Sequence, residues 1–248
     1  MLTLLLTSRV KNNKDSNIDR LLSSLVECGG NKDNCEVLIK YDTDDTEQPD
    51  ESHFLKYPFD VKKFIWSRGE GRHSIHLDHF YLFTQKNPKS KFVLLCADDF
   101  TFIQNGFIDE IISIKDEYCF VGPRRPRVEL YCNRWMDRSI MNIWKHNEGV
   151  SLPCISVRTL EVLQNYGWQC NADNWVTLLA ILMYETYGID MWKTVSNFYL
   201  RNPTDGTSGY GDSYNNMEMD GDKNPKNEYY FDLVKQQSKN LYLNMINK

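Results

Sequence analysis

Five apolar residues, 92–96, follow one another without a break, and two carboxylates, Asp98 and Asp99, come just behind them. A run this short and this apolar predicts a strand buried on both faces, which is typical of a parallel sheet covered by helices. Ligands of such sheets bind beyond the carboxyl ends of the strands. Adjacent acids repel each other unless a cation or a donor compensates them. The pattern therefore predicts a divalent cation, and with it a phosphorylated ligand.

Bulk composition limits the class of protein. The chain has 248 residues, 41% of them hydrophobic, which is enough for a substantial core in one large domain. Its net charge of −5 and the lack of a long basic run give no electrostatic support for binding nucleic acid. The apolar N-terminal segment is too short to span a membrane and lacks the features of a signal peptide.

The chain has seven scattered cysteines, most of them within apolar runs. Their odd number and their apolar surroundings are typical of reduced core thiols. Cys28 and Cys35 could pair in an oxidising compartment, but reduced thiols are favoured. We therefore expect a cytoplasmic protein.

The first hundred residues alternate between strand and helix patterns. Apolar runs predict strands at 2–6, 36–41, 64–66 and 92–96, and helical spacing predicts helices at about 18–26 and 73–85. This order is the rhythm of a mostly parallel Rossmann-type sheet flanked by helices, an α/β fold. Polar residues follow each of the first three strands. They are Thr7, Ser8 and Arg9 after the first strand, Asp42 to Asp45 after the second, and Arg68 to Arg72 after the third.

The second half is less regular. The patterns predict helices at 106–114, 174–187 and 231–246, and strands at 118–121, 150–157 and 192–200. Pro153 breaks the strand at 150–157 and favours an edge strand or a turn there. Residues 201–227 are rich in Gly, Asn, Asp, Ser and Pro, which predicts a mobile loop suited to closing over a bound ligand.

These features resemble a GT-A glycosyltransferase: an acid after the second strand, Ala97-Asp98-Asp99 after the fourth, and Asp173 just before a buried helix. Members of this family bind a nucleotide-sugar through a short acidic motif, DxD, whose last carboxylate holds Mn²⁺ or Mg²⁺ on the diphosphate. The motif here lacks its first acid, so Asp99 carries the match as the metal ligand. The overall style resembles that of short single-domain, family-2-like enzymes of viruses and bacteria. If the protein is viral, the expected location is the host cytoplasm.

The resemblance also implies roles for other residues. Asp42, with Asp44 beside it, corresponds to the position that contacts the base, often uracil. Asp173, in Asn171-Ala-Asp-Asn-Trp175, corresponds to the general base of inverting members. The full nucleotide-sugar set is then Thr7, Ser8, Arg9, Asp42, Asp44, Arg68, Arg72 and Asp98.

The resemblance implies one GT-A-like domain over residues 1–248. Its nucleotide-sugar-binding half would be 1–100 and its acceptor-binding half 101–200, followed by the loop and the last helix at 201–248. The implied activity is transfer of a sugar from a UDP-sugar to a hydroxyl of a glycan or glycoprotein, with inversion.

Two other functions remain open. A nucleotidyltransferase that makes nucleotide-sugars uses a similar sheet, although residues 7–14 have cations and no glycine where its phosphate loop would lie. A non-catalytic carbohydrate-binding protein of the same fold would tolerate the missing acid. Each acid also has a purely structural alternative, since Asp173 could only cap its helix and Asp42 to Asp45 could form a solvated turn.

Overall fold

A computed structural model describes residues 1–8, 17–67, 73–98, 100–123, 154–164, 172–201 and 226–247. Within these ranges, the side chains of residues 17, 73–77, 97, 172–174, 201 and 226–231 lie outside the description. The loop predicted at 201–227 falls almost entirely outside the described residues.

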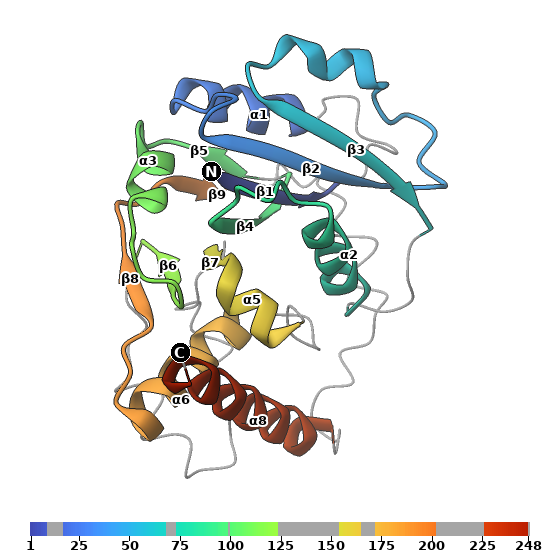
Figure 1. The fold of residues 1–248 in the computed structure, drawn as a ribbon. Coiled ribbons are helices and arrows are strands. Elements are labelled where there is room, and N and C mark those ends of the chain that lie inside the picture. Colours follow the sequence, from blue (N-terminus) through green and yellow to red (C-terminus); the bar gives the residue numbers. More distant parts are fainter. Residues whose placement is uncertain are drawn as a thin grey trace.

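The described residues form a seven-stranded sheet with the strand order β3-β2-β1-β4-β7-β6-β8 (Figure 1). Its strands are β1 (Leu2–Thr7), β2 (Cys35–Asp42), β3 (Asp60–Trp66), β4 (Phe92–Ala97), β6 (Phe120–Gly122), β7 (Cys154–Ser156) and β8 (Trp192–Thr194). The pairs β1–β2, β2–β3 and β1–β4 are parallel. The predicted α/β fold with a mostly parallel half is confirmed, and the carboxyl ends of β3, β2, β1 and β4 lie along one edge.

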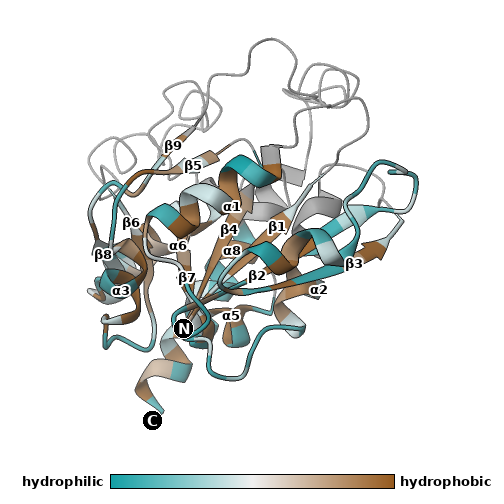
Figure 2. Cartoon of the chain, turned by 90° about the horizontal axis from the view of Figure 1, so that it is seen from above, coloured by the Kyte–Doolittle hydropathy of each residue, from teal (hydrophilic) through white to brown (hydrophobic). Residues whose placement is uncertain are grey.

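Hydrophobic residues explain why β1, β2 and β4 lie inside the sheet. Alternate side chains of each strand enter two separate cores, so that Leu4 packs on one face and Leu5 on the other. One core contains α1 (Asn17–Glu27) and α3 (Phe107–Ile112). The other contains α2 (His73–Thr84), α5 (Val157–Leu163), α6 (Ala172–Tyr187) and α8 (Lys226–Ile246). Figure 2 shows β1 and β4 as predominantly hydrophobic, whereas the edge strand β3 is mixed.

The segment predicted as a strand at 150–157 differs from the expectation in two ways. β7 lies between β4 and β6 and is antiparallel to both, so it is an interior strand and not an edge. Pro153 lies outside the described residues, one position before β7 begins. Val157 starts α5, because the hydroxyl of Ser156 caps this helix by accepting a hydrogen bond from the backbone N–H of Thr159 at 3.3 Å.

The strand predicted at 192–200 is in fact two strands in different sheets. β8 pairs with β6 in the large sheet, while β9 (Tyr199–Arg201) pairs with β5 (Phe100–Phe102) in a two-stranded antiparallel sheet. Sequence patterns did not indicate β5, α5 or the short 3-10 helix η1 (Glu51–Lys56). All three are short, with three to seven residues, and therefore give little periodic signal.

α6 and α8 are joined by a buried polar contact as well as by apolar packing. The indole N–H of the fully buried Trp175 donates to Oε1 of Gln237 at 2.8 Å. α6 ends at Tyr187, directly before Gly188, whose φ of +69° is readily adopted only by glycine.

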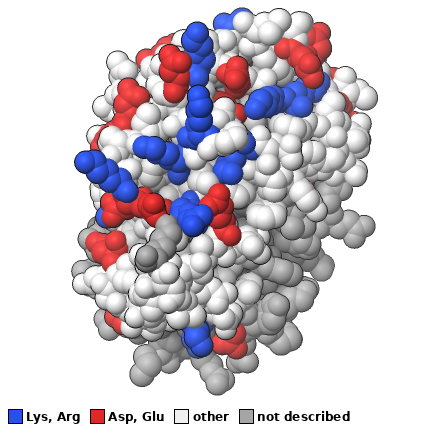
Figure 3. All heavy atoms as spheres, viewed as in Figure 1, with Lys and Arg blue, Asp and Glu red and all other residues white. Residues whose placement is uncertain are grey.

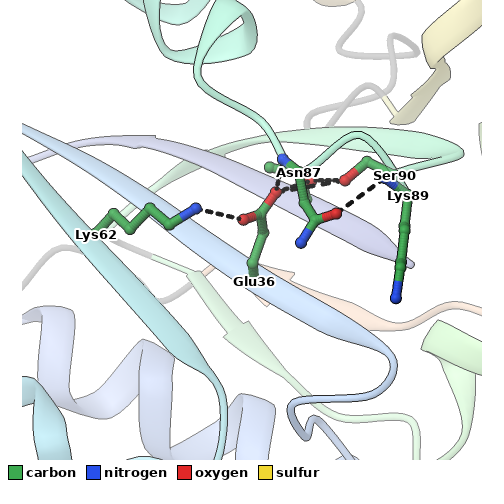
Figure 4. A network of polar contacts seen from close by, with 6 residues as sticks. Glu36, Lys62, Asn87, Lys89 and Ser90 are labelled. Atoms are coloured by element: carbon green, nitrogen blue, oxygen red, sulfur yellow. Dashed lines mark hydrogen bonds and ion pairs between the residues drawn. The ribbon is translucent and has the colours of Figure 1, made fainter.

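A buried carboxylate joins the amino-terminal ends of the strands (Figure 4). Glu36 is 1% exposed, and its Oε1 accepts hydrogen bonds from the Thr3 hydroxyl at 2.8 Å and the Asn87 backbone N–H at 2.6 Å. The Ser90 hydroxyl lies 3.3 Å from the same oxygen, and Oε2 accepts from Lys62 Nζ at 3.3 Å. This network fixes the connection between α2 and β4 against β1, β2 and β3, at the edge opposite the acidic carboxyl ends.

The surface carries both signs of charge. On the face drawn in Figure 3, basic side chains gather in the upper half with acidic side chains among them. Five cysteines among the described residues are free and buried. They are Cys28, Cys35, Cys96, Cys119 and Cys154. In the described part of the chain, no helix combines the length and the apolar character needed to cross a bilayer.

Candidate nucleotide-binding edge

The ends of β1, β2 and β4 lie side by side because the three strands pair in register. Thr7 is opposite Lys40 of β2 on one side and opposite Ala97 of β4 on the other. The next residues along each strand, Ser8, Tyr41 and Asp98, are therefore at the same level of the sheet. Parallel strands bring their carboxyl ends to a common edge, so residues 90 positions apart in sequence become neighbours.

Ser8 and Asp98 are in direct contact. The hydroxyl of Ser8 donates to Oδ2 of Asp98 at 2.9 Å, and the backbone N–H of Ser8 donates to the carbonyl of Lys40 at 3.0 Å. Ser8 is buried and Asp98 is half-buried. Ser8 thus holds the Asp98 carboxylate in a defined orientation at the end of β4.

The chain changes sheets immediately after Asp98. β4 ends at Ala97 in the large sheet, and β5 begins at Phe100 in the small sheet with β9. Asp98 therefore lies in the junction between the two sheets. Asp99 is outside the described residues, so its predicted role as metal ligand stays a prediction.

Asp42 closes β2 and is buried, with 7% of its surface exposed. Its Oδ1 forms an ion pair with Nζ of Lys40, which also lies 3.0 Å from Oδ2 of Asp78 in α2. Asp44 is exposed in the following turn, whereas Asp45 is buried, with its backbone N–H donating to the Asp42 carbonyl at 3.1 Å. Sequence analysis did not identify Lys40 or Asp78, because a single lysine in an apolar strand gives no hint of its partners.

Tyr41 adds a buried hydroxyl near the same edge. Burial raises the pKa of Tyr41, and the nearby carboxylates of Asp98 and Asp45 raise it further. The phenol therefore stays protonated at neutral pH, so that it can donate a hydrogen bond beside the acids. Sequence analysis did not assign this residue either, because its side chain belongs to the apolar core on the α1 face.

The remaining predicted residues are only partly described. Asp173 is the second residue of α6, but its side chain lies outside the description. Arg9, Arg68 and Arg72 fall wholly outside the described residues. Among the described residues, no group of three or more His, Cys, Asp or Glu side chains could hold a metal ion. The carboxylate of Asp98 is a hard oxygen donor, the ligand type that Mg²⁺ and Mn²⁺ prefer in proteins.

Comparisons with known proteins give a fold and no family. No protein-family model matches the sequence, and no curated protein matches it. Among solved structures, S. aureus TarS 1-349 aligns with a TM-score of 0.53 and 15% identity, over 81% of this chain and 60% of that chain. The same TarS 1-349 in complex with UDP has a TM-score of 0.53 and 14% identity, over 83% and 61% of the two chains.

TarS 1-349 in complex with UDP-GlcNAc also aligns with a TM-score of 0.53, at 15% identity over 83% of this chain and 59% of that chain. This chain therefore spans about 60% of the length of TarS 1-349. At this identity the likeness shows the fold alone. The GT-A-like fold predicted from the sequence is confirmed.

Proposed function

We propose that this protein is a glycosyltransferase that moves a sugar from a nucleotide-diphosphate donor, a UDP-sugar, to a hydroxyl of a glycan or glycoprotein. The observation that carries the proposal is the meeting of Ser8, Asp42 and Asp98 at the carboxyl ends of three adjacent parallel strands. In open α/β sheets this edge is where nucleotides bind. The TarS structures, which share the fold, include complexes with UDP and UDP-GlcNAc.

Donor binding in this proposal uses the residues of the edge. Asp42, with Asp44 at the rim, accepts a hydrogen bond from the base. Thr7, Ser8 and Arg9 line the nucleotide at the end of β1. Arg68 and Arg72, after β3, neutralise phosphate oxygens through charge-assisted hydrogen bonds.

A divalent cation, Mn²⁺ or Mg²⁺, fits the acids at the end of β4. Asp99 and Asp98 would hold it, and Ser8 fixes the orientation of the Asp98 carboxylate through the 2.9 Å hydrogen bond. When bound, the ion offsets the negative charge that develops on the diphosphate leaving group.

Transfer then requires one proton acceptor and one displacement. Asp173, at the start of α6, takes the proton of the acceptor hydroxyl as its oxygen bonds to the anomeric carbon. The bond between that carbon and the diphosphate breaks in the same step, and the nucleoside diphosphate leaves. A single displacement inverts the anomeric centre. An Asp173→Asn variant should keep donor binding and lose transfer, because the amide cannot accept the proton.

The proposal includes a cytoplasmic location. Its support is chemical: the five described cysteines are free and buried, which suits a reducing compartment.

Asp99→Ala tests the enzyme directly, with Asp33→Ala, an exposed acid in the turn before β2, as the matched control. UDP release from UDP-sugars is measured with acceptor and Mn²⁺, and UDP binding is measured by calorimetry. We expect Asp99→Ala to lower turnover on the order of 100-fold while Asp33→Ala stays at the wild-type rate. If Asp99→Ala still binds UDP in a metal-dependent way with wild-type affinity, the assignment of Asp99 as metal ligand is wrong. A wild-type protein that binds no UDP-sugar would refute the proposed glycosyltransferase activity. Release of pyrophosphate from a nucleoside triphosphate and a sugar phosphate would instead indicate a nucleotidyltransferase.

A further inference from the structure

Lys40 is a lysine buried inside the sheet, next to the acid that the proposed function assigns to base recognition. Its side chain is 3% exposed, and it lies between the carboxylates of Asp42 and Asp78, which are 10% and 9% exposed. A buried ammonium group is tolerated only when charged partners replace its water, and the same holds for each buried carboxylate. The three groups are therefore interdependent, and removal of one changes the environment of the other two.

The second carboxylate, Asp78, is fixed from both sides. Its Oδ2 lies 3.0 Å from Lys40 Nζ, and its Oδ1 accepts a hydrogen bond from the indole N–H of Trp66 at 2.6 Å. Lys40 Nζ also lies 5.8 Å from the centroid of the Trp66 ring. Trp66 is the cross-strand partner of Asp42 at the end of β3. The network thus connects β2, β3 and α2, and it leaves neither oxygen of Asp78 open to a ligand.

Asp42 is different, because only one of its oxygens has a partner among the described residues. Oδ1 is held by Lys40, while Oδ2 accepts no hydrogen bond from any residue in the described part of the chain. An ionised carboxylate can only accept hydrogen bonds. Oδ2 of Asp42 is therefore a hydrogen-bond acceptor whose direction is set by Lys40. It lies at the carboxyl end of β2, where the proposed function places the nucleotide. An imide N–H, such as N3–H of uracil, is a donor of the right kind, and a base methylated at that nitrogen is not.

We propose that Lys40 and Asp78 are positioning residues, which hold Asp42 so that its free oxygen accepts the imide N–H of the donor base. Uracil and thymine carry such an N–H, so the donor in this proposal is a nucleoside diphosphate sugar with one of these bases. This inference rests on the proposed function, since it requires a nucleotide at the edge formed by β1, β2 and β4.

The experiment compares calorimetric binding of UDP with that of UDP methylated at N3, in the presence of Mn²⁺. Wild-type protein should prefer UDP by about tenfold or more, the range expected for a hydrogen bond to a charged group. Lys40→Met should bring this ratio close to one. Asp78→Asn, which keeps the side-chain shape, should lower the ratio by about threefold, because a neutral partner holds Lys40 less firmly.

Lys62→Met is the matched control, since Lys62 also pairs with a buried acid, Glu36, but at the opposite edge of the sheet. It should keep the wild-type ratio. A variant that is merely less stable loses affinity for both ligands equally, so the ratio separates positioning from folding. Where Lys40→Met does not fold, as judged by circular dichroism, Asp78→Asn supplies the result.

The outcomes separate the two proposals. If wild-type protein binds UDP but does not distinguish the methylated form, or if Lys40→Met and Asp78→Asn keep the full ratio, the positioning role is wrong while donor binding stands. If wild-type protein binds neither ligand, the proposed function itself fails.

Discussion

Glu36 allows a prediction of stability whose size follows from its contacts (Figure 4). In Glu36→Gln, the oxygen that accepts from Thr3 and Asn87 is retained, but both bonds lose their charge assistance. A hydrogen bond to a charged group is worth about 1.5–3 kcal/mol and a neutral one about 0.5–1.5 kcal/mol. Two such bonds therefore give a loss of about 2 kcal/mol in the free energy of unfolding.

Glu36→Ala should cost more, for a reason visible in the same network. The hydroxyls of Thr3 and Ser90 lie 2.5 Å apart and can still pair with each other. The backbone N–H of Asn87 then has no acceptor, and a cavity remains, so we expect a loss of about 3–4 kcal/mol. Lys62→Met should cost less than about 1 kcal/mol, because the Lys62 side chain is 46% exposed and water screens its ion pair.

Urea unfolding followed by circular dichroism measures this series by linear extrapolation. The expected order of destabilisation is Lys62→Met, then Glu36→Gln, then Glu36→Ala. UDP affinity should not change in Lys62→Met or Glu36→Gln, since Glu36 lies at the edge opposite the proposed nucleotide site. A Lys62→Met as unstable as Glu36→Ala would show that the exposed ion pair and not the buried acceptor carries the effect. Equal stability of Glu36→Gln and wild type would show that the charge of Glu36 contributes nothing to either.

Two further predictions concern titratable groups. Burial raises the pKa of Asp19, but hydrogen bonds from Tyr57 and His53 outweigh it and hold the pKa below the usual value. Because the folded pKa is the lower one, this stabilisation is present above the unfolded pKa of about 3.8 and is lost as pH falls through the folded pKa. Asp19→Asn should therefore make the free energy of unfolding less dependent on pH in acid. Urea unfolding between pH 5 and 2.5 measures this dependence. A variant whose free energy of unfolding falls with pH as steeply as that of the wild type would show that these contacts do not matter. Burial raises the pKa of Cys35 and of Cys119 to about 12. Both thiols should therefore resist iodoacetamide at pH 8 in the native protein and react with it in urea. Rapid labelling of either cysteine in the native protein, mapped by mass spectrometry, would contradict their burial.

The sequence by itself determined the α/β class and the position of the acidic edge. Residues 92–96 are apolar without a break, and a strand of that kind is stable only when both its faces are covered. Once four such runs alternate with helical patterns, parallel pairing follows, and the polar residues after each run must meet at one edge. That local information placed Asp42 and Asp98 at the carboxyl ends of their strands, whereas Ser8 was named only through the resemblance.

Only the tertiary structure decided how the other elements and partners combine. β7 inserts next to β4 because backbone pairing, which leaves no periodic signal in three residues, selects its neighbours. Lys40 meets Asp78 because α2 packs over β2, and whether a lysine is solvated or buried between two acids depends on that packing and not on its sequence neighbours. Periodicity is a local property of the chain, whereas desolvation and ion pairing arise only when distant segments come together.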